Sequence, residues 1–252
     1  MNSPKILNIV IPMAGRGSRF ADAGYTDPKP MIPVGGRPMI EWVIENIRPA
    51  RAHRFIFLCL GEHLIRYPQV ETKLRELCPE CEIVSVDQVT EGAACTVLLA
   101  RDLIDSEAPL MIANSDQIVD LPIDSYLNAG DEADGLIMTF WADDPKWSYC
   151  RINDYGQATE VVEKQVVSND ATVGIYNFRQ GADFIRAADQ MISRDLRVNG
   201  EFYVAPTYNQ LIEEGSKILV KPTGSEGKGM YGLGIPSDLE LFMQTDYYLG
   251  RI

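Results

Sequence analysis

The feature that most constrains this chain is a glycine-rich loop that directly follows a short apolar segment. Residues 6–11 (Ile-Leu-Asn-Ile-Val-Ile) are typical of a buried strand, and residues 13–19 (Met-Ala-Gly-Arg-Gly-Ser-Arg) come immediately after it. A strand that opens into such a loop presents several backbone N–H groups in one concave patch, and patches of this kind bind phosphate. The first residues therefore predict a phosphate-binding unit of an α/β fold.

Cations accompany this loop. Arg16 and Arg19 lie within it, and Lys29 follows between two prolines. This combination suits a triphosphate, whose charge must be neutralised while a bond to phosphorus is made or broken. The P-loop pattern is absent, and the dinucleotide fingerprint would need a glycine where Phe20 stands. Without the residues that follow, a Gly-x-Gly of this kind could equally be an ordinary strand-to-helix turn.

The distribution of charge favours a small anionic substrate. The 252 residues carry a net charge of −13, but residues 1–50 contain six Lys/Arg against four Asp/Glu. Nucleic-acid binding needs a basic footprint, so the overall acidity argues against a nucleic-acid partner. An acidic protein that concentrates cations around its glycine loop is suited to capture an anion at that place.

Length, hydrophobicity and cysteine usage point to a globular cytoplasmic protein. The 252 residues with 46% apolar content allow one large α/β domain or two small ones. No apolar run approaches the roughly 20 residues of a membrane span. Five cysteines, an odd number, favour a reducing compartment over a disulfide framework. Cys78 and Cys81 form a Cys-x-x-Cys pair, but it precedes a predicted strand and has no second pair, so we interpret it as a plain loop.

The hydrophobic periodicity predicts alternating strands and helices up to residue 116. We expect strands at 54–60, 82–87 and 110–114, and helices at 38–47, 70–77 and 93–104. This alternation predicts a doubly wound, mainly parallel sheet. The second half changes rhythm, with further strands at 136–141, 149–153, 158–163 and 172–178. Helices are predicted there at 182–193, 206–214 and 237–248.

The long continuation of the glycine loop carries a family resemblance. Residues 15–19 (Gly-Arg-Gly-Ser-Arg), 28–30 (Pro-Lys-Pro) and 33–40 (Pro-Val-Gly-Gly-Arg-Pro-Met-Ile) stand in this order. Together they resemble the signature of the nucleoside-triphosphate transferase superfamily, in particular the sugar-phosphate nucleotidyltransferases (pyrophosphorylases). The resemblance implies Mg²⁺-dependent transfer of a nucleoside monophosphate from a nucleoside triphosphate to a phosphorylated sugar or small alcohol, for surface polysaccharide or lipid precursors. Pyrophosphate would be released.

The same resemblance implies a fold and its division. We expect a single α/β domain over 1–252, a Rossmann-like mixed sheet with an inserted part that covers the substrate. Residues 1–120 would form the nucleotide-binding half and residues 121–252 the acceptor-binding half. No Pro/Gly/Ser-rich linker separates the two.

The resemblance also assigns roles around the nucleotide. Arg19 would face the β- and γ-phosphates and Lys29 the α-phosphate, as the two catalytic cations. Arg37 is a further cation, equally compatible with a solvated residue at a turn. Residues 88–93 (Gln-Val-Thr-Glu-Gly-Ala) resemble the family's base-binding loop. The expected nucleotide-binding residues are Ala14, Gly15, Arg16, Gly17, Gln88, Gly92 and Ala93.

A metal site is expected where the fourth predicted strand ends. Asp116 follows that strand, at the edge where open α/β sheets bind ligands, and a carboxylate there suits Mg²⁺. The family usually adds an Asp late in the chain, a few residues after a Gly-Glu pair. Here Gly-Glu is present at 200–201, but Pro206 and Thr207 occupy the expected position. Glu201 is our first substitute as metal ligand, with Asn209 or a water molecule behind it.

The acceptor is expected to meet the second half. Glu163 and Lys164 end a predicted strand, as a Glu-Lys pair does in the family, where the lysine holds the acceptor phosphate. Gly174 is a further substrate-side match. Aromatic residues near these strands could line an acceptor pocket or belong to the core: Trp141, Trp147 and Tyr149.

Two other readings remain open. A glycosyltransferase of related fold would show Asp-x-Asp after the fourth strand, whereas residues 114–116 (Asn-Ser-Asp) retain one acid. A regulatory subunit that binds nucleotide without turnover is favoured by the missing late Asp. Among nucleotides, the pattern around 200–209 resembles the smaller cytidylyltransferase-like members, so we prefer CTP over UTP, dTTP or GTP. A homodimer is left open as the oligomeric state.

Overall fold

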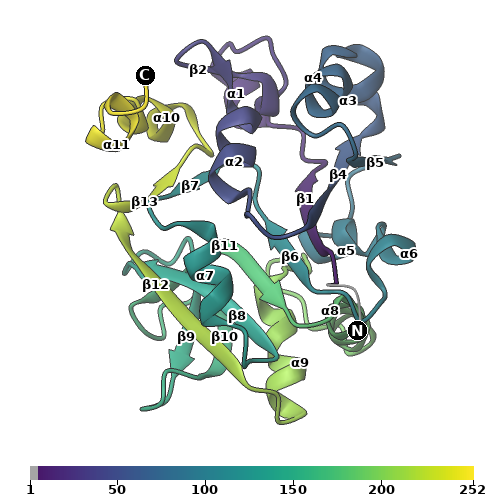
Figure 1. Cartoon of the computed structure of the whole chain (residues 1–252), viewed down its shortest axis with the longest axis vertical. Coiled ribbons are helices and arrows are strands. Elements are labelled where there is room, and N and C mark those ends of the chain that lie inside the picture. The colour runs from purple at the N-terminus through teal and green to yellow at the C-terminus, as the bar shows by residue number, and fades with distance from the viewer. Residues whose placement is uncertain (1–4) are drawn as a thin grey trace.

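The parallel strands expected in the first half form one side of a large central sheet. The computed structural model describes residues 5–252, and within them the chain forms an 11-stranded mixed sheet (Figure 1). Four neighbouring strands run parallel to one another, which confirms the α/β class. They are, in spatial order, β5 (Glu82–Val86), β4 (His53–Leu60), β1 (Leu7–Met13) and β6 (Leu110–Ala113).

Strands of the second half extend the sheet beyond β6. β11 (Asp170–Phe178) lies antiparallel between β6 and β8 (Gly135–Trp141). The sheet then continues through β12 (Ile218–Glu226), β13 (Gly229–Gly232) and β7 (Gln117–Val119). β9 (Ser148–Ile152) pairs with β11 and with β10 (Ala158–Glu163), and this hairpin stands off the main path of the sheet.

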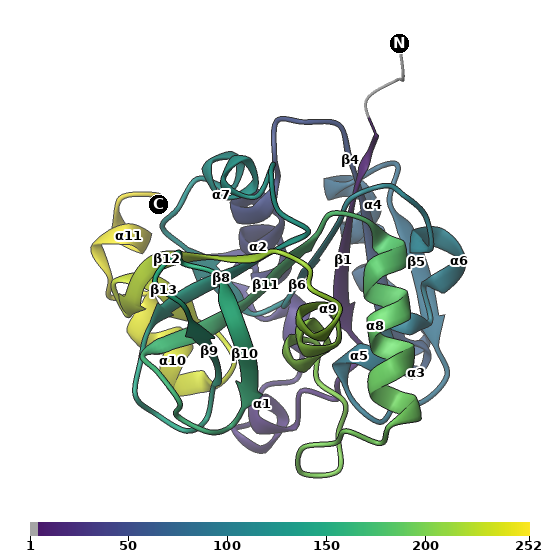
Figure 2. The same cartoon turned by 90° about the horizontal axis from the view of Figure 1, so that it is seen from below.

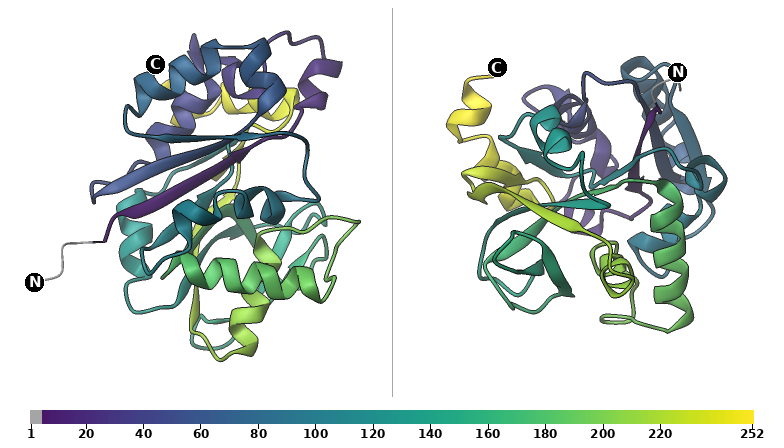
Figure 3. Two further views of the ribbon diagram at one scale, coloured as in Figure 1. Left: turned by 90° about the vertical axis from the view of Figure 1, so that its right-hand side faces the viewer. Right: turned by 60° about the horizontal axis from the view of Figure 1, so that its bottom comes forward.

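Helices cover both faces of the sheet, as a doubly wound fold requires (Figure 3). One face carries α2 (Met39–Ile47), α3 (Gly61–Arg66), α4 (Gln69–Leu77), α7 (Ile123–Ala129), α10 (Pro236–Phe242) and α11 (Asp246–Leu249). The opposite face carries α5 (Ala93–Leu98), α6 (Arg101–Ile104), α8 (Gly181–Ser193) and α9 (Tyr208–Glu213). Figure 2 shows α8 and α9 in front of the strands.

The two cores follow from the period-2 geometry of the strands. In β1, Ile9 and Ile11 pack into the core beneath α2, while Val10 packs into the core beneath α8. In the neighbouring β4, Phe57 packs into the first of these cores and Ile56 into the second. Because both faces are covered, consecutive side chains are all buried, and the strands have continuous apolar runs.

Short elements carry the glycine-rich segment away from the sheet. After β1 the chain enters α1 (Ser18–Asp22), a 3₁₀ turn η1 (Lys29–Met31) and a small hairpin of β2 (Pro33–Val34) and β3 (Arg37–Pro38). A second 3₁₀ turn, η2 (Ala205–Thr207), precedes α9. No helix in residues 5–252 combines the length and hydrophobicity needed to cross a membrane.

The structure divides two expected helices and adds elements that the sequence pattern does not predict, β12 among them. The helix expected at 93–104 is two short helices, α5 and α6, separated by a turn at Leu99 and Ala100. The helix expected at 237–248 is likewise divided into α10 and α11. β12 was not predicted, since Pro222 and Gly224 interrupt its pattern, yet it pairs with both β8 and β13.

The C-terminal helices pack through an aromatic cluster, which gives a test of their role in stability. Phe242 is 2% exposed and contacts the rings of Trp42, Tyr231 and Tyr248 at centroid distances of 5.5–5.9 Å. Phe242→Ala should lower the free energy of unfolding by about 3–5 kcal/mol, because it leaves a cavity in this cluster. Urea denaturation followed by circular dichroism measures the change. Leu241→Ala, at a 63% exposed neighbour, is the control and should change it by under about 0.5 kcal/mol.

Candidate active site

A cavity of about 350 Å³ opens at the edge where β1 and β6 end. The two strands are parallel neighbours, so the glycine loop after β1 and residues 114–116 after β6 emerge side by side. Three segments distant in sequence form the wall, together with Gly234 near the start of α10. The lining residues are Pro12, Met13, Gly15, Gly17, Ser18, Arg19, Phe20, Lys29, Pro30, Asn114, Ser115, Asp116 and Gly234.

Lys29 and Asp116 form an ion pair inside this cavity. The Lys29 ammonium donates to Oδ2 of Asp116, and both side chains are only about a fifth exposed. Gly234 approaches them from the other side. A Cβ at this position would lie 3.1 Å from Oδ2 of Asp116 and 4.0 Å from Nζ of Lys29. The absence of a side chain at Gly234 thus leaves space beside a carboxylate and an ammonium.

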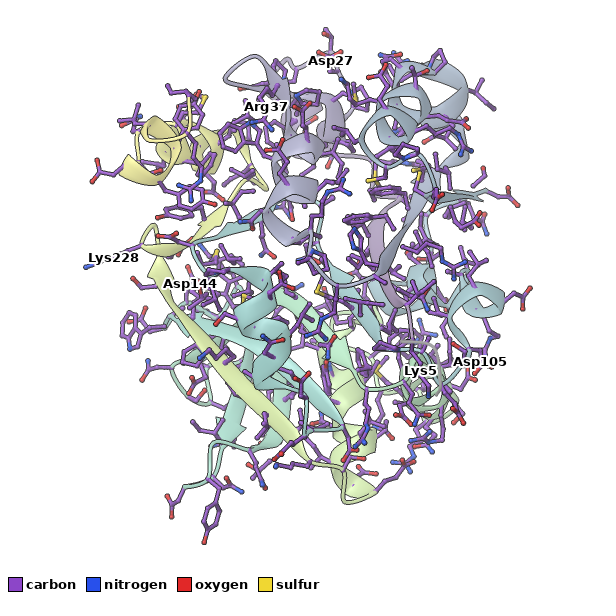
Figure 4. The ribbon with its side chains drawn as sticks, viewed as in Figure 1. Lys5, Asp27, Arg37, Asp105, Asp144 and Lys228 are labelled. Atoms are coloured by element: carbon purple, nitrogen blue, oxygen red, sulfur yellow. The ribbon has the colours of Figure 1, made fainter. Side chains whose placement is uncertain are left out.

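The three arginines of the N-terminal segment lie in different surroundings. Arg19 lines the cavity, whereas the largely exposed Arg16 is 3.8 Å from Glu62 and does not contribute its side chain to the wall. Arg37 is held by Glu41 and Glu45 at 2.8 Å and 2.5 Å, and its guanidinium stacks on the Trp42 ring. Figure 4 shows Arg37 near the start of α2.

A second, smaller cavity of about 180 Å³ adjoins the first at Asn114, which lines both. Asn114 Nδ2 donates to Oε1 of Gln117 at 3.1 Å. Gly174, on β11, lies against this pair, and a Cβ there would be 2.2 Å from Asn114 Nδ2. A glycine is therefore required here for the Asn114 and Gln117 side chains to keep these positions. The other charged and aromatic lining residues are Lys146, Trp147, Glu163, Tyr176 and Tyr203.

Glu163 brings a buried carboxylate to this second cavity. It ends β10 opposite Ser148 of β9, whose hydroxyl donates to the carboxylate. Burial raises the pKa of Glu163, and the Ser148 hydrogen bond opposes that rise. Lys164 follows in an exposed position, and its Nζ donates to the Tyr203 hydroxyl at 2.5 Å.

Several expected site residues lie apart from the cavity that holds Asp116. Gln88 is exposed and lines neither cavity, while Ala93 lines the second one. Glu201 lines neither cavity, and its carboxylate is close to the Tyr203 hydroxyl instead. Asn209 is engaged with the backbone of Val161, accepting from its N–H and donating to its carbonyl at 2.8 Å each.

One acidic residue near Asp116 was not singled out from the sequence. Asp238 is in the first turn of α10, and its Oδ2 would lie 3.4 Å from a Cβ at Gly232. Burial raises the pKa of Asp238. The nearby charged groups that act on this pKa are Lys146, Glu226, Arg19 and Asp116. The only sequence signal for it is an acid shortly after Gly234-Ile-Pro, which by itself also fits an ordinary helix start.

The chemistry of these side chains suits Mg²⁺. Residues 5–252 hold no group of three or more His, Cys, Asp or Glu side chains arranged around a common point. Mg²⁺ does not need one, because it keeps water ligands and binds through one or two carboxylates plus substrate phosphates. Asp116 supplies a carboxylate at the cavity wall, and the space beside Gly234 leaves room next to it.

The raised pKa of Glu163 gives a testable pH dependence. A buried acid of this kind stabilises the fold below its ordinary pKa, and that contribution is lost as the pH rises through the raised value. Glu163→Gln should therefore melt at a higher temperature than the wild type, by a margin that grows from about pH 4 to about pH 8. Thermal melts across this range measure it. Glu160→Gln, at an exposed position of the same strand, should show no such growth.

Two curated relatives resemble the chain over most of its length. The chain is 26% identical over 98% of its length to the bifunctional protein GlmU of Methanococcus maripaludis strain S2, but it spans only 55% of that relative. It is 24% identical over 84% of its length to the UTP–glucose-1-phosphate uridylyltransferase AglF of Haloferax volcanii, covering 86% of AglF.

A solved structure has the same fold. The nucleoside-diphosphate-sugar pyrophosphorylase from Vibrio cholerae RC9 is 26% identical and superposes with a TM-score of 0.83, over 94% of this chain and 100% of that one. The nucleotidyl transferase family model matches residues 9–201. The match covers more than half of the sequence, so the chain belongs to the nucleotidyl transferase family.

Proposed function

We propose that the chain is a Mg²⁺-dependent nucleotidyltransferase that transfers a nucleoside monophosphate from a nucleoside triphosphate to a phosphorylated sugar or small alcohol. The observation that carries this proposal is that the two cavities share Asn114 as a lining residue. One cavity holds the glycine loop, Lys29 and Asp116, and the other holds Glu163. Two phosphorylated substrates can therefore approach each other at a point bordered by both a cation and a carboxylate.

The nucleotide would occupy the larger cavity. Backbone N–H groups of residues 14–17 and the Arg19 guanidinium would hold the β- and γ-phosphates, and Lys29 would reach the α-phosphate. Lys29 would then exchange its contact with Asp116 for one with phosphate oxygens. The loop over 88–93 would contact the base through Gln88 and the backbone at Gly92 and Ala93.

Asp116 is the residue that would hold Mg²⁺, with Asp238, which lines a different cavity, as the second acidic side chain. The ion, when bound, neutralises charge on the triphosphate and on the departing pyrophosphate. Release of Asp116 from Lys29 would free its carboxylate for this purpose. Asp238 supports the assignment through its electrostatic interaction with Asp116 and with Arg19, which lines the cavity.

The acceptor would occupy the smaller cavity with its phosphate toward Asn114. An oxygen of that phosphate attacks the α-phosphorus in line with the bond to the bridging oxygen, whose electron pair leaves with pyrophosphate. Lys29 stabilises the charge that develops on the α-phosphoryl oxygens, and Lys164 would hold the acceptor phosphate. Glu163 would accept a hydrogen bond from the part of the acceptor that carries no phosphate. Its carboxylate is free to do so because the Ser148 hydroxyl occupies only part of its capacity to accept hydrogen bonds.

The choice of nucleotide, the location and the product rest on the sequence pattern. We propose CTP as the nucleotide, a cytoplasmic location, and a product used for surface polysaccharide or lipid assembly, with a homodimer as the state to test. Residues 1–120 and 121–252 would act as nucleotide and acceptor halves of one domain. A glycosyltransferase is the less favoured alternative, since it leaves the Arg19 and Lys29 pair without a role.

A substrate panel tests the function directly. Pyrophosphate release is measured for CTP, UTP, dTTP and GTP, each with several sugar 1-phosphates and amino-alcohol phosphates. Turnover that requires both substrates and Mg²⁺ is the expected result. Nucleotide binding without pyrophosphate release in any pair would instead indicate a non-catalytic regulatory subunit.

The cavity cations give the first mutational prediction. Lys29→Ala and Arg19→Ala should each lower kcat/KM by about 100-fold or more, equivalent to roughly 3 kcal/mol of transition-state stabilisation. Each removes a positive charge from the cavity in which the phosphates would react. Lys228→Ala, at an exposed residue labelled in Figure 4, is the matched control and should leave kcat/KM unchanged. Wild-type turnover in both cavity variants would contradict the assignment.

The carboxylates give a prediction that does not depend on turnover. Asp116→Asn should abolish Mg²⁺-dependent activity, and both Asp116→Asn and Asp238→Asn should weaken Mn²⁺ binding to the protein–nucleotide complex, by about tenfold or more for Asp116→Asn. Electron paramagnetic resonance of Mn²⁺ measures the affinity. Glu240→Gln, an exposed acid of the same helix as Asp238, serves as control. Unchanged Mn²⁺ affinity in Asp238→Asn would remove Asp238 from the site and leave Asp116 in place.

A further inference from the structure

The loop proposed to bind the base is joined by its backbone to the loop before η2. Phe202 N–H donates to the Glu91 carbonyl at 2.8 Å, and Ala94 N–H donates to the Phe202 carbonyl at 3.0 Å. Gly92 lies between these two bonds with φ +128°, and a Cβ there would be 2.4–2.8 Å from backbone atoms of Phe202. The two loops therefore touch backbone to backbone, and neither can shift without the other.

Arg197 adds a side-chain link between the same loops. Its guanidinium is 3.3 Å from the Glu91 carboxylate and stacks over the Phe202 ring at 4.2 Å from the centroid. Arg197 thus contacts Glu91 of one loop by charge attraction and Phe202 of the other by stacking on its ring. Such a combination restricts the Phe202 side chain as well as its backbone.

Tyr203 follows Phe202 directly and reaches Lys164. It lines the second cavity, its hydroxyl accepts from Nζ of Lys164 at 2.5 Å, and that ammonium lies 4.8 Å from the Tyr203 ring centroid. Lys164 has φ +56°, which is uncommon for a residue with a side chain, and its N–H donates to the Trp147 carbonyl at 3.0 Å. The Lys164 side chain is thus placed by Tyr203 at one end and by this backbone conformation at the other.

We propose that Tyr203 is a positioning residue that couples the base-binding loop to the lysine that receives the acceptor phosphate. A nucleotide that orders residues 88–93 also orders Phe202, through the bonds on both sides of Gly92. Tyr203 is covalently next in the chain and lines the second cavity, so its ring and hydroxyl hold Lys164, which lines neither cavity itself, close to that cavity when the nucleotide is bound. Acceptor affinity consequently rises with nucleotide occupancy, and by linkage the acceptor raises nucleotide affinity by the same factor. This inference rests on the proposed nucleotidyltransferase function.

Hydrogen–deuterium exchange tests the link between the loops without any turnover. The probe is an equimolar mixture of CTP, UTP, dTTP and GTP with Mg²⁺. Peptides covering 88–94 and 199–204 should gain protection together, although only the first is proposed to contact nucleotide. Protection confined to 88–94 would overturn the coupling. Protection nowhere on the chain would overturn the proposed function, and the coupling with it.

Kinetics with paired variants test the role of Tyr203 itself. Tyr203→Phe removes one oxygen and should raise the KM for the phosphorylated acceptor by roughly tenfold. Glucose 1-phosphate is the first acceptor to use, and if it is not turned over, the acceptor that is active in the substrate panel replaces it. The dissociation constant of the nucleotide without acceptor should change by less than about twofold, while by linkage the KM for the nucleotide at saturating acceptor should rise by a similar factor. Tyr155→Phe removes the same oxygen from an 84% exposed tyrosine and should have no effect.

A double-mutant cycle separates positioning from simple structural support. If Tyr203 acts through Lys164, Tyr203→Phe should add nothing to the acceptor KM once Lys164→Ala is present. Lys164→Ala alone should raise that KM by about tenfold or more. Additive effects, or a weaker affinity of Tyr203→Phe for the nucleotide in the absence of acceptor, would overturn the proposal. Melting curves of each variant verify that the compared proteins are equally folded.

Discussion

The pairing of β1 with β6 is the constraint on which the candidate site depends. These strands lie about a hundred residues apart in sequence, yet they run parallel, with Asn8 opposite Leu110 and Val10 opposite Ile112. Parallel neighbours end at the same edge, so the glycine loop and Asp116 meet there without any specific contact having to guide them. Burial on both faces fixes the register, because a slip of one residue would exchange the side chains of the two cores.

The local chemistry of the glycine loop and the place of Asp116 at the sheet edge were predictable from the sequence, but proximity that depends on short irregular strands was not. The residues from the glycine loop to Pro38 identified the family, because the backbone groups and cations expected to bind phosphate lie close together in this part of the sequence. Asp238 escaped notice because its closeness to Asp116 depends on β13 pairing with β7, strands of four and three residues without hydrophobic alternation. Arg37 shows the reverse case, since a cation inside the motif is used by Glu41, Glu45 and Trp42 for packing.

Charge is used differently in the two cavities. In the larger one, Lys29 and Asp116 neutralise each other in the free protein, so neither carries an unpaired charge at the partly buried wall. Substrate and Mg²⁺ would replace this contact by two others of the same kind. In the smaller one, Glu163 has a hydroxyl partner and a raised pKa, so its charge is supported less fully until a ligand donates to it.

The two halves of the chain are joined where their proposed substrates would react. Asn114 lines both cavities, and Gly174 approaches it so closely that a side chain would displace either Asn114 or Gln117. On the far side of the second cavity, the Phe202 backbone lies against Gly92. Glycine thus allows close contact at both ends of the boundary, once on β11 and once before α5. The loop at 88–93, which we propose binds the base, is thus held by backbone bonds to Phe202, in the half that we propose binds the acceptor.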